Sequence, residues 1–457
     1  MASKVKKGVL YYIAWVVFLT LGIFCIFSVI LIFNPGKDVF GISFRYVSDN
    51  NTTKYNTVNV GGADTPIKQL AITDINVNAG FTDIQVKTVS EYENITIMLD
   101  KNIVGFSSSK NVTYIFDMSY ENNQLNINIT EPELSLKLAP NATLTIFCPK
   151  GYSFENYNLN INTTSGDIYI GTSDGYDLNA KQLNLVSKSG KIKVRGLTNI
   201  SSGIVNIETE TSNIDIYANI KSELNIETKS SKIYIEKIEG NLNVKADELK
   251  AKCDKILGNI TFSSSKGYIT VDELGNLATK SGGNFVATAD SMHIANVTIN
   301  KMAGDVSLPN AEKSDITINE LYGDAYVNTT SGRVKLGKCY GLLTIETTSG
   351  AVTFTQASAE RTDVKTLNGK IVGNFNQISV ADLKTERANI EVNFNADLRI
   401  VINYNSAKDI SASWITTTLE KSGTVLTPNT DASSDVVMNI TTEKSGSILI
   451  SNKFIMA

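Results

Sequence analysis

Few residues of this 457-residue chain have the type and spacing that catalysis or metal binding requires. His293 is the only histidine, which argues against the usual zinc sites and Ser-His-Asp triads. No pair of the four cysteines has the spacing of metal ligands. We therefore interpret His293 as a structural or surface residue and expect no catalytic residues, no cofactor-binding residues and no metal ligands.

Acidic residues follow some regularly spaced glycines and could bind calcium or cleave glycans. They are Asp167, Asp305, Asp315 and Asp324. Calcium-binding nine-residue repeats carry an aspartate in each Gly-Gly-x-Gly-x-Asp unit, whereas here the aspartates occur only sporadically. A glycan-cleaving β-helix would cluster carboxylates on neighbouring coils, and no such set stands out at 18-residue intervals. We predict that the chain is not an enzyme.

The cysteines do not predict a disulfide framework. Cys25 lies in an apolar segment near the N-terminus, which leaves an odd number of cysteines outside it. Cys148 and Cys339 stand at apolar positions of alternating patterns and predict small core residues, while the pattern leaves Cys253 open. A surface protein of this size without disulfides suits a Gram-positive bacterium better than a eukaryotic secretory route.

Glycines at nine-residue intervals form the most informative pattern of the chain. Gly323, Gly332, Gly341 and Gly350 are nine residues apart, and apolar residues stand two and four places after nearly every one. A repeat of this kind is typical of a solenoid. The predicted structural corner residues are Gly166, Gly190, Gly240, Gly258, Gly267, Gly323, Gly332, Gly341, Gly350 and Gly369.

Each unit predicts one short strand followed by a tight corner. Alternation of apolar and polar residues turns one set of side chains inward, and glycine, serine or asparagine allows the positive φ or the side-chain-to-backbone bonds of a sharp turn. Two units make a coil, and wider intervals upstream predict longer corners. We therefore predict an all-β parallel β-helix, or β-solenoid, of about 18–24 residues per coil. A β-sandwich is the alternative, with hairpins at irregular intervals.

The uncharged residues 8–33 predict an N-terminal transmembrane helix. The segment is long enough to span a bilayer, Tyr11, Tyr12 and Trp15 suit an interfacial belt, and no Ala-x-Ala cleavage motif follows. The short basic N-terminus most simply stays in the cytosol. We expect a single-pass protein of the cell membrane with its C-terminal domain outside the cell.

The rest of the chain is mildly acidic. The three lysines before residue 34 are the only charged side chains there, so 39 basic and 46 acidic residues follow, for a net charge of −7. This charge argues against nucleic acid and anionic lipid as partners.

The predicted organisation is a cytosolic tail (1–7), the transmembrane helix (8–33), a linker (34–66), an N-terminal β region of the solenoid (67–150), the solenoid repeats (151–395) and a C-terminal β cap (396–457).

Two runs of sequence resemble a known family. LTIFCPKGYSF (residues 144–154) and LNINTTSGDIYI (residues 159–170) are similar to the bacterial putative-adhesin β-helix family, with its repeated Thr-x-Ser-Gly-x-Ile corners. The resemblance covers about residues 67–395. It implies a β-helix on a single-pass or secreted surface protein, and it brings no catalytic residue with it.

These observations favour an adhesive or surface-binding module without catalytic activity. Exposed rows of Thr, Asn and Tyr would contact an extracellular glycan or protein. The alternatives are a structural spacer of the cell envelope and an accessory subunit of a membrane complex.

Overall fold

The computed structural model describes most of the chain from residue 45 onward. The described residues are 12, 15–23, 25–26, 29, 38–39, 42–43, 45–93, 95–107, 113–134, 136–137, 141–149, 154–171, 180–195, 203–377, 380–395, 399–427 and 436–452. The predicted tail 1–7 lies outside them, and the predicted span 8–33 is described only in part. Among the described residues, no helix has the length and apolar character needed to cross a membrane.

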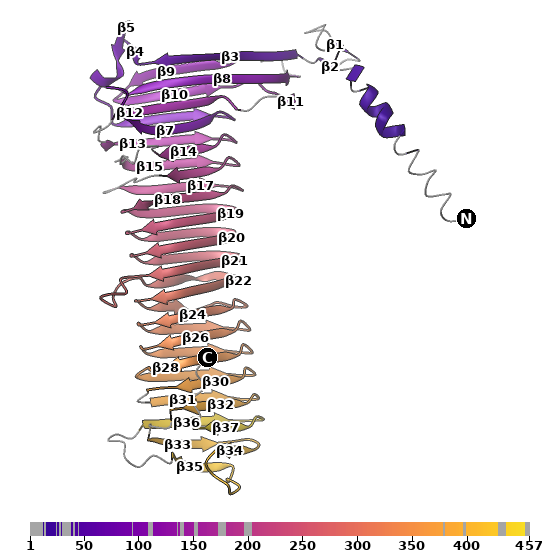
Figure 1. The fold of residues 1–457 in the computed structure, drawn as a ribbon, viewed down its shortest axis with the longest axis vertical. Coiled ribbons are helices and arrows are strands. Elements are labelled where there is room, and N and C mark those ends of the chain that lie inside the picture. The colour runs from indigo at the N-terminus through magenta and orange to yellow at the C-terminus, as the bar shows by residue number, and fades with distance from the viewer. Residues whose placement is uncertain are drawn as a thin grey trace.

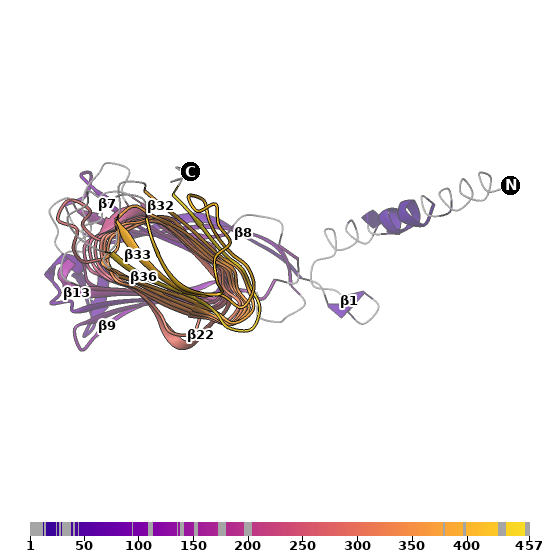
Figure 2. The ribbon, with the colours of Figure 1, turned by 90° about the horizontal axis from the view of Figure 1, so that it is seen from below.

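The chain winds into a flattened solenoid whose coils stack along one long axis (Figure 1). Each coil contributes one strand to a first sheet and the next strand to a second sheet, so that the coils superimpose when viewed along the axis (Figure 2). The first sheet contains β13 (Phe154–Thr163), β15 (Ala180–Ser187), β17 (Ile204–Thr209), β23 (Val306–Leu308), β25 (Ala325–Thr329), β27 (Leu343–Thr347), β29 (Arg361–Thr366) and β31 (Val380–Thr385). The second contains β14 (Ile168–Gly171), β16 (Ile192–Arg195), β18 (Ile214–Ile220), β24 (Ile316–Leu321), β26 (Val334–Cys339), β28 (Val352–Ala357), β30 (Ile371–Phe375) and β32 (Ile390–Phe394).

Four long strands bend around one corner and belong to both sheets. They are β19 (Glu223–Ile238), β20 (Leu242–Ile256), β21 (Ile260–Leu274) and β22 (Phe285–Met302). They therefore join the two sheets into one continuous hydrogen-bonded sheet that wraps around the core.

The coils pair in parallel, and the pairing confirms the predicted all-β solenoid. Ile168 pairs with Ile192, 24 residues later, and Ile192 pairs with Ile214. From Leu242, which pairs with Ile260, most coils are 18 or 19 residues long. Parallel pairing of successive coils rules out the sandwich of antiparallel hairpins for this part of the chain.

The Thr-Thr-Ser-Gly corners show how the sequence forms each turn. In β27, Leu343 and Ile345 point into the core and the final Thr347 is also buried. The Thr347 hydroxyl accepts a hydrogen bond from the Gly350 amide (2.7 Å) and donates one to the Gly350 carbonyl oxygen (3.1 Å). The first threonine of the motif is thus a polar core residue that satisfies the backbone of its own corner.

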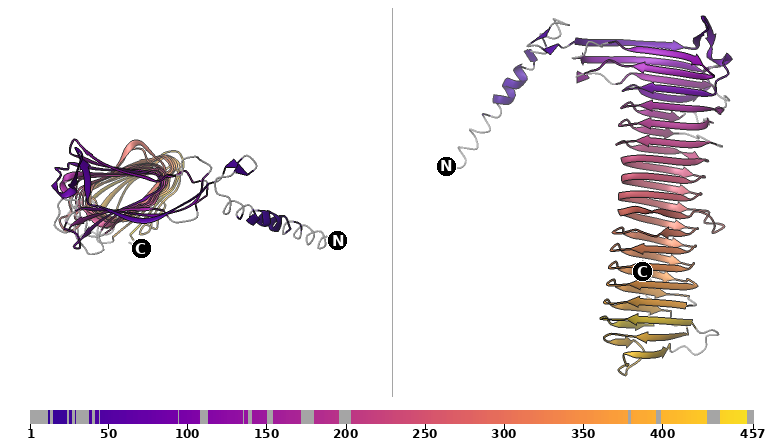
Figure 3. Two further views of the ribbon diagram at one scale, coloured as in Figure 1. Left: turned by 90° about the horizontal axis from the view of Figure 1, so that it is seen from above. Right: turned by 180° about the vertical axis from the view of Figure 1, so that it is seen from behind.

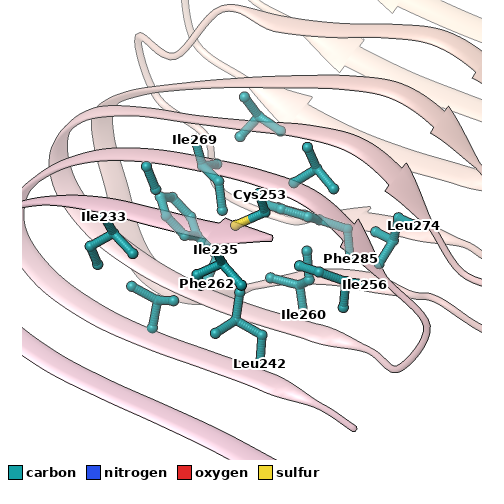
Figure 4. Packing of buried hydrophobic residues seen from close by; sticks show 14 of the residues in the cluster. Ile233, Ile235, Leu242, Cys253, Ile256, Ile260, Phe262, Ile269, Leu274 and Phe285 are labelled. Atoms are coloured by element: carbon teal, nitrogen blue, oxygen red, sulfur yellow. The ribbon is translucent and has the colours of Figure 1, made fainter. Parts of the chain in front are cut away.

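Apolar side chains fill the space between the sheets along the whole axis. Figure 4 shows part of this core, where Cys253 lies among Ile235, Phe262 and Ile269. Cys148 and Cys339 are buried as predicted, and Cys253, which the sequence left open, is a core residue as well. Burial raises the pKa of the Cys253 and Cys339 thiols to about 12.

These three thiols are expected to be inert while the protein is folded. A pKa about three units above the ordinary value lowers the thiolate population about a thousandfold, and burial also excludes reagents. Maleimide labelling of the full-length protein at pH 8, counted by mass spectrometry, should modify no cysteine other than Cys25 under native conditions. In guanidinium chloride all four should react. Rapid native labelling of Cys253 would contradict the placement of β20.

The N-terminal end corrects the predicted linker 34–66. β3 (Arg45–Tyr55) pairs with β8 (Thr96–Ser107) along its full length, in the antiparallel sense. The hairpin of β4 (Thr57–Val60) and β5 (Ala63–Pro66) and the short 3-10 helix η1 (Ile67–Gln69) follow. The prediction failed because β3 is a mostly exposed edge strand that needs no apolar alternation.

The first coil of the solenoid, β6 (Asp74–Ala79) and β7 (Asp83–Val89), does not lie at its end. It lies between the coil of β13 and β14 and the strands β10 (Gln124–Thr130) and β12 (Thr143–Pro149), with which it pairs in parallel. Antiparallel strands cover the outer side and cap this end (Figure 3). They are β9 (Ile115–Glu121), β8, β3 and β11 (Leu136–Lys137). A separate hairpin joins β1 (Asp38–Val39) and β2 (Ile42–Ser43).

The C-terminal segment 396–457 does more than cap the stack. β33 (Ile400–Asn405) and β34 (Ile410–Ala412) form the last coil in space, and β35 (Ser422–Leu426) covers β33 in the antiparallel sense. The chain then returns, and β36 (Val436–Thr442) and β37 (Ile448–Ser451) insert between the last coil and the coil of β31 and β32. The final strands are therefore an internal coil of the solenoid.

Candidate functional site

The predicted corner glycines form columns at the two edges of the solenoid. At one edge, Gly190 lies against Gly166 of the preceding coil, and Gly332, Gly350 and Gly369 lie against one another in three successive coils. Gly267 lies against Leu249. At the other edge Gly258 follows Gly240 and Gly341 follows Gly323. These glycines are structural, because each places its α-carbon against the backbone of the preceding coil.

Close stacking, and not a positive φ, explains nearly all of these glycines. Of the ten, only Gly267 has a positive φ, of 115°. A β-carbon on Gly190 would lie 2.0 Å from the carbonyl oxygen of Gly166, and one on Gly341 would lie 2.2 Å from that of Gly323. A positive φ, one of the two reasons that the sequence suggested for these corners, therefore does not apply to the other nine. They are glycine because consecutive coils approach too closely for a side chain.

The aspartates after the glycines have a structural partner. The Asp305 carboxylate accepts a hydrogen bond from the Asp324 amide (2.8 Å), and the Asp324 carboxylate accepts one from the Leu342 amide (2.7 Å). Asn241 and Asn259 make the same bond in earlier coils. This column was missed in the sequence because asparagine occupies it in the earlier coils and aspartate in the later ones. Among the described residues, no group of three or more His, Cys, Asp or Glu side chains could hold a metal ion.

His293 is exposed on the surface and lies against the Glu312 carboxylate. No second histidine exists to join it, so the pair makes a local surface contact.

A groove on the outer face of the first sheet, lined by a row of asparagines, is the candidate functional site. It has a volume of about 700 Å³ and runs across β15, β17, β19, β20 and β21. Four asparagines, one from each of four successive coils, line it side by side, namely Asn184, Asn206, Asn225 and Asn243. At about 4.8 Å per coil, the row from Asn184 to the aligned Thr261 extends about 19 Å along the axis.

The asparagines form a continuous ladder of side-chain amides. Asn206 donates to Asn184 (2.7 Å), Asn225 donates to Asn206 (2.9 Å), and Asn243 donates to Asn225 (2.8 Å). The ladder continues beyond the groove through Asn160, Asn76 and Asn126. An amide has two N–H donors and two acceptor lone pairs, and each ladder bond uses one of each. Asn206 and Asn225 therefore each keep one donor and one acceptor for a ligand, in an orientation fixed by their neighbours. At the ends of the groove row, Gln182 also donates to Asn184 (3.1 Å) and Asn243 also donates to Glu223 (3.1 Å).

Charged side chains of both signs border the amide row. Glu208, Glu227 and Lys245 each stand two residues after a ladder asparagine, on three successive coils. Lys245 forms an ion pair with Glu227 at 2.7 Å. Lys229 and Glu210 form a second pair at 3.5 Å. These pairs are exposed, so they add little to stability. Charges of both signs, with glutamates in excess, beside neutral amides suit a neutral polar ligand better than a polyanion.

Comparison with known proteins finds a family match over part of the chain. Residues 106–283, which include the whole groove, match the family described as Toastrack DUF4097. This match confirms the resemblance to the putative-adhesin β-helix family that the corner motifs indicated.

Two solved structures are similar to this chain at low identity. A putative adhesin of Bacteroides fragilis is 13% identical with a TM-score of 0.28, covering 60% of this chain and 97% of its own. A putative cell adhesion protein of Clostridium sporogenes is 10% identical with a TM-score of 0.17, covering 89% of this chain and 100% of its own. At these TM-scores neither likeness carries an argument. No curated protein matches the chain.

Proposed function

We propose that this protein is a binding module of the bacterial cell surface, which holds an extended neutral glycan in the groove and does not catalyse a reaction. In this proposal residues 8–33 anchor the chain in the cell membrane and the solenoid lies outside the cell. The single observation that carries the proposal is the amide ladder, because Asn206 and Asn225 each present a free donor and a free acceptor in the middle of a row about 19 Å long.

A glycan suits this surface for chemical reasons. Each sugar hydroxyl can both donate and accept a hydrogen bond, and Asn206 and Asn225 each retain one donor and one acceptor to match it. The groove is open and its amides are held in place by their neighbours, so little ordering is needed on binding. Its carboxylates are exposed, and Glu227 and Glu210 are already paired with lysines, which supports binding without catalysis.

Removing rungs of the ladder should weaken binding. We expect the double variant Asn206→Ala/Asn225→Ala to bind glycans at least tenfold more weakly than the unchanged protein, because two adjacent bidentate contacts are lost. The measurement is titration of the full-length protein in detergent micelles against a glycan array. Asn393→Ala is the matched control, since Asn393 makes the same amide bond to Asn374 (2.8 Å) on the second sheet.

The result separates this proposal from its alternatives. Equal glycan binding by the double variant and the unchanged protein would remove the groove from the mechanism. Absence of binding together with growth in size at higher concentration would support a structural spacer instead. Absence of both would favour an accessory subunit of a membrane complex.

A further inference from the structure

A second surface feature lies at a corner of the solenoid, several coils beyond the groove, and shares no residue with it. Tyr322 follows β24 and Tyr340 follows β26, so they occupy equivalent positions in adjacent coils. Their rings are stacked, with centroids 4.9 Å apart and planes 7° apart. The Tyr322 hydroxyl donates to the Glu320 carboxylate at 2.6 Å, which raises the pKa of Tyr322 to about 12.

An insertion closes one end of this stack. The loop after β21 lengthens its coil and folds back through a bridge between Asn276 and Ser281. It places the Lys280 ammonium 4.7 Å from the centroid of the Tyr322 ring. Lys280 has a φ of 53°, a left-handed conformation that a lysine adopts at some cost. Insertions in repeat proteins commonly gather on the binding face.

The other end of the stack is open. The equivalent position in the next coil is Ser358, whose amide donates to the carbonyl oxygen of Cys339 just as the Tyr340 amide donates to Leu321. A serine is too small to continue the stack, and the Tyr340 side chain is 39% exposed. Among the described residues, no ring or cation contacts Tyr340 apart from Tyr322.

A second pair of neighbouring tyrosines, Tyr217 and Tyr234, has a cation over each of its two rings and is called the closed pair. Tyr217 and Tyr234 are 5.0 Å apart and tilted by 43°. Arg195 lies over the Tyr217 ring (5.3 Å) and Lys252 lies over the Tyr234 ring (6.0 Å), so each ring already has a cation partner. The pair of Tyr322 and Tyr340 has a cation at one end only.

We propose that the ring face of Tyr340 beside Ser358 is a binding subsite for a pyranose ring of a glycan. The sugar stacks its apolar C–H face on the tyrosine, where a third aromatic ring of the column would lie. Gln356 stands two residues before Ser358. It occupies the same position in its coil as Glu320 does two coils earlier, because Glu320 pairs with Lys338 and Lys338 pairs with Gln356. It is therefore placed to bond a sugar hydroxyl as Glu320 bonds the Tyr322 hydroxyl.

A sugar fits this place better than an aromatic or proline side chain of a protein partner. Polar residues occupy the neighbouring register positions. Lys338 stands two residues before Tyr340 and pairs with Gln356, which stands two residues before Ser358. The equatorial hydroxyls of a pyranose satisfy these groups in the plane of the ring, whereas an apolar side chain would leave them without hydrogen bonds.

The test uses the full-length protein in detergent micelles and saturation-transfer NMR with methyl glucosides, methyl galactosides and N-acetylglucosamine. We expect saturable binding of at least one sugar, reduced at least tenfold by Tyr340→Ala. Ser358→Tyr should reduce it equally, because a third ring then covers the subsite. Tyr340→Phe keeps the ring and should stay within twofold, as should Tyr217→Ala, which removes a ring from the closed pair.

Three results would overturn the proposal. They are no saturable sugar binding, sugar binding unchanged by Tyr340→Ala, and Tyr340-dependent binding of a proline-rich or aromatic peptide library in place of sugars. Thermal melting of each variant confirms that the solenoid is folded. The Asn206→Ala/Asn225→Ala variant should bind these sugars at Tyr340 as well as the unchanged protein does, so failure of the groove and failure of this subsite are distinguishable.

Discussion

Replacing Gly350 with alanine is expected to lower the free energy of unfolding by about 3 kcal/mol or more. The new β-carbon would lie 1.9 Å from the carbonyl oxygen of Gly332 in the preceding coil. The β-carbon would clash with a backbone atom, and the parallel pairings of β25 with β27 and of β26 with β28 hold the two coils at a fixed spacing. The clash can be relieved only by breaking part of this ladder.

Guanidinium unfolding followed by far-ultraviolet circular dichroism measures the loss. Ser314→Ala is the control, since Ser314 stands in the same column one coil before Gly332 and already carries a β-carbon. It loses the hydroxyl that accepts a hydrogen bond from the buried Ala295 amide (2.9 Å), a cost of about 1–3 kcal/mol without any backbone clash. A Gly350→Ala protein as stable as the unchanged chain would show that the coils can separate and that close stacking is not the reason for the glycine.

Replacing Ile440 with asparagine is expected to destabilise the protein by about 3–5 kcal/mol, although Ile440 lies near the C-terminus. The strand that carries it, β36, pairs with β31 on one side and β33 on the other, and its side chain is fully buried. The change removes a large apolar side chain from an internal coil and buries an amide in its place.

Leu449→Asn provides the matched comparison. Leu449 lies on β37 of the same coil but points outward and is 47% exposed, so this change should cost less than about 0.5 kcal/mol. Thermal unfolding of the two variants measures the difference. If both variants melt like the unchanged protein, then β36 does not lie inside the stack and the C-terminal segment is a loose cap.

Much of the local structure could be predicted because it depends on short-range patterns. The alternation in Leu343, Ile345 and Thr347 sets which side chains point inward, and the glycine at each corner marks the turn. Where the alternation was absent the prediction failed. β3 was predicted to be a linker because it is an edge strand whose side chains are mostly exposed, and such a strand needs no alternation of apolar and polar residues.

The candidate site could be predicted only as a kind of surface. Rows of exposed asparagine and tyrosine were expected, but not which ones meet. Asn184, Asn206 and Asn225 are 22 and 19 residues apart, because the corners between them differ in length. A column with uneven spacing is not visible as a period, even though its side chains touch.

The sequence by itself therefore determined the strands, the corners, the parallel coils and the apolar core, since each follows from the conformational preferences of neighbouring residues and the burial of alternate side chains. Only the tertiary structure decided the order of the coils at both ends, where β6 and β36 lie inside the stack. It also decided which side chains form the amide ladder and that Lys280 meets Tyr322. The physical reason is that every coil presents nearly the same strand edge to its neighbours. The order of the coils therefore depends on pairing between strands that are distant in the sequence, and no local sequence pattern predicts it.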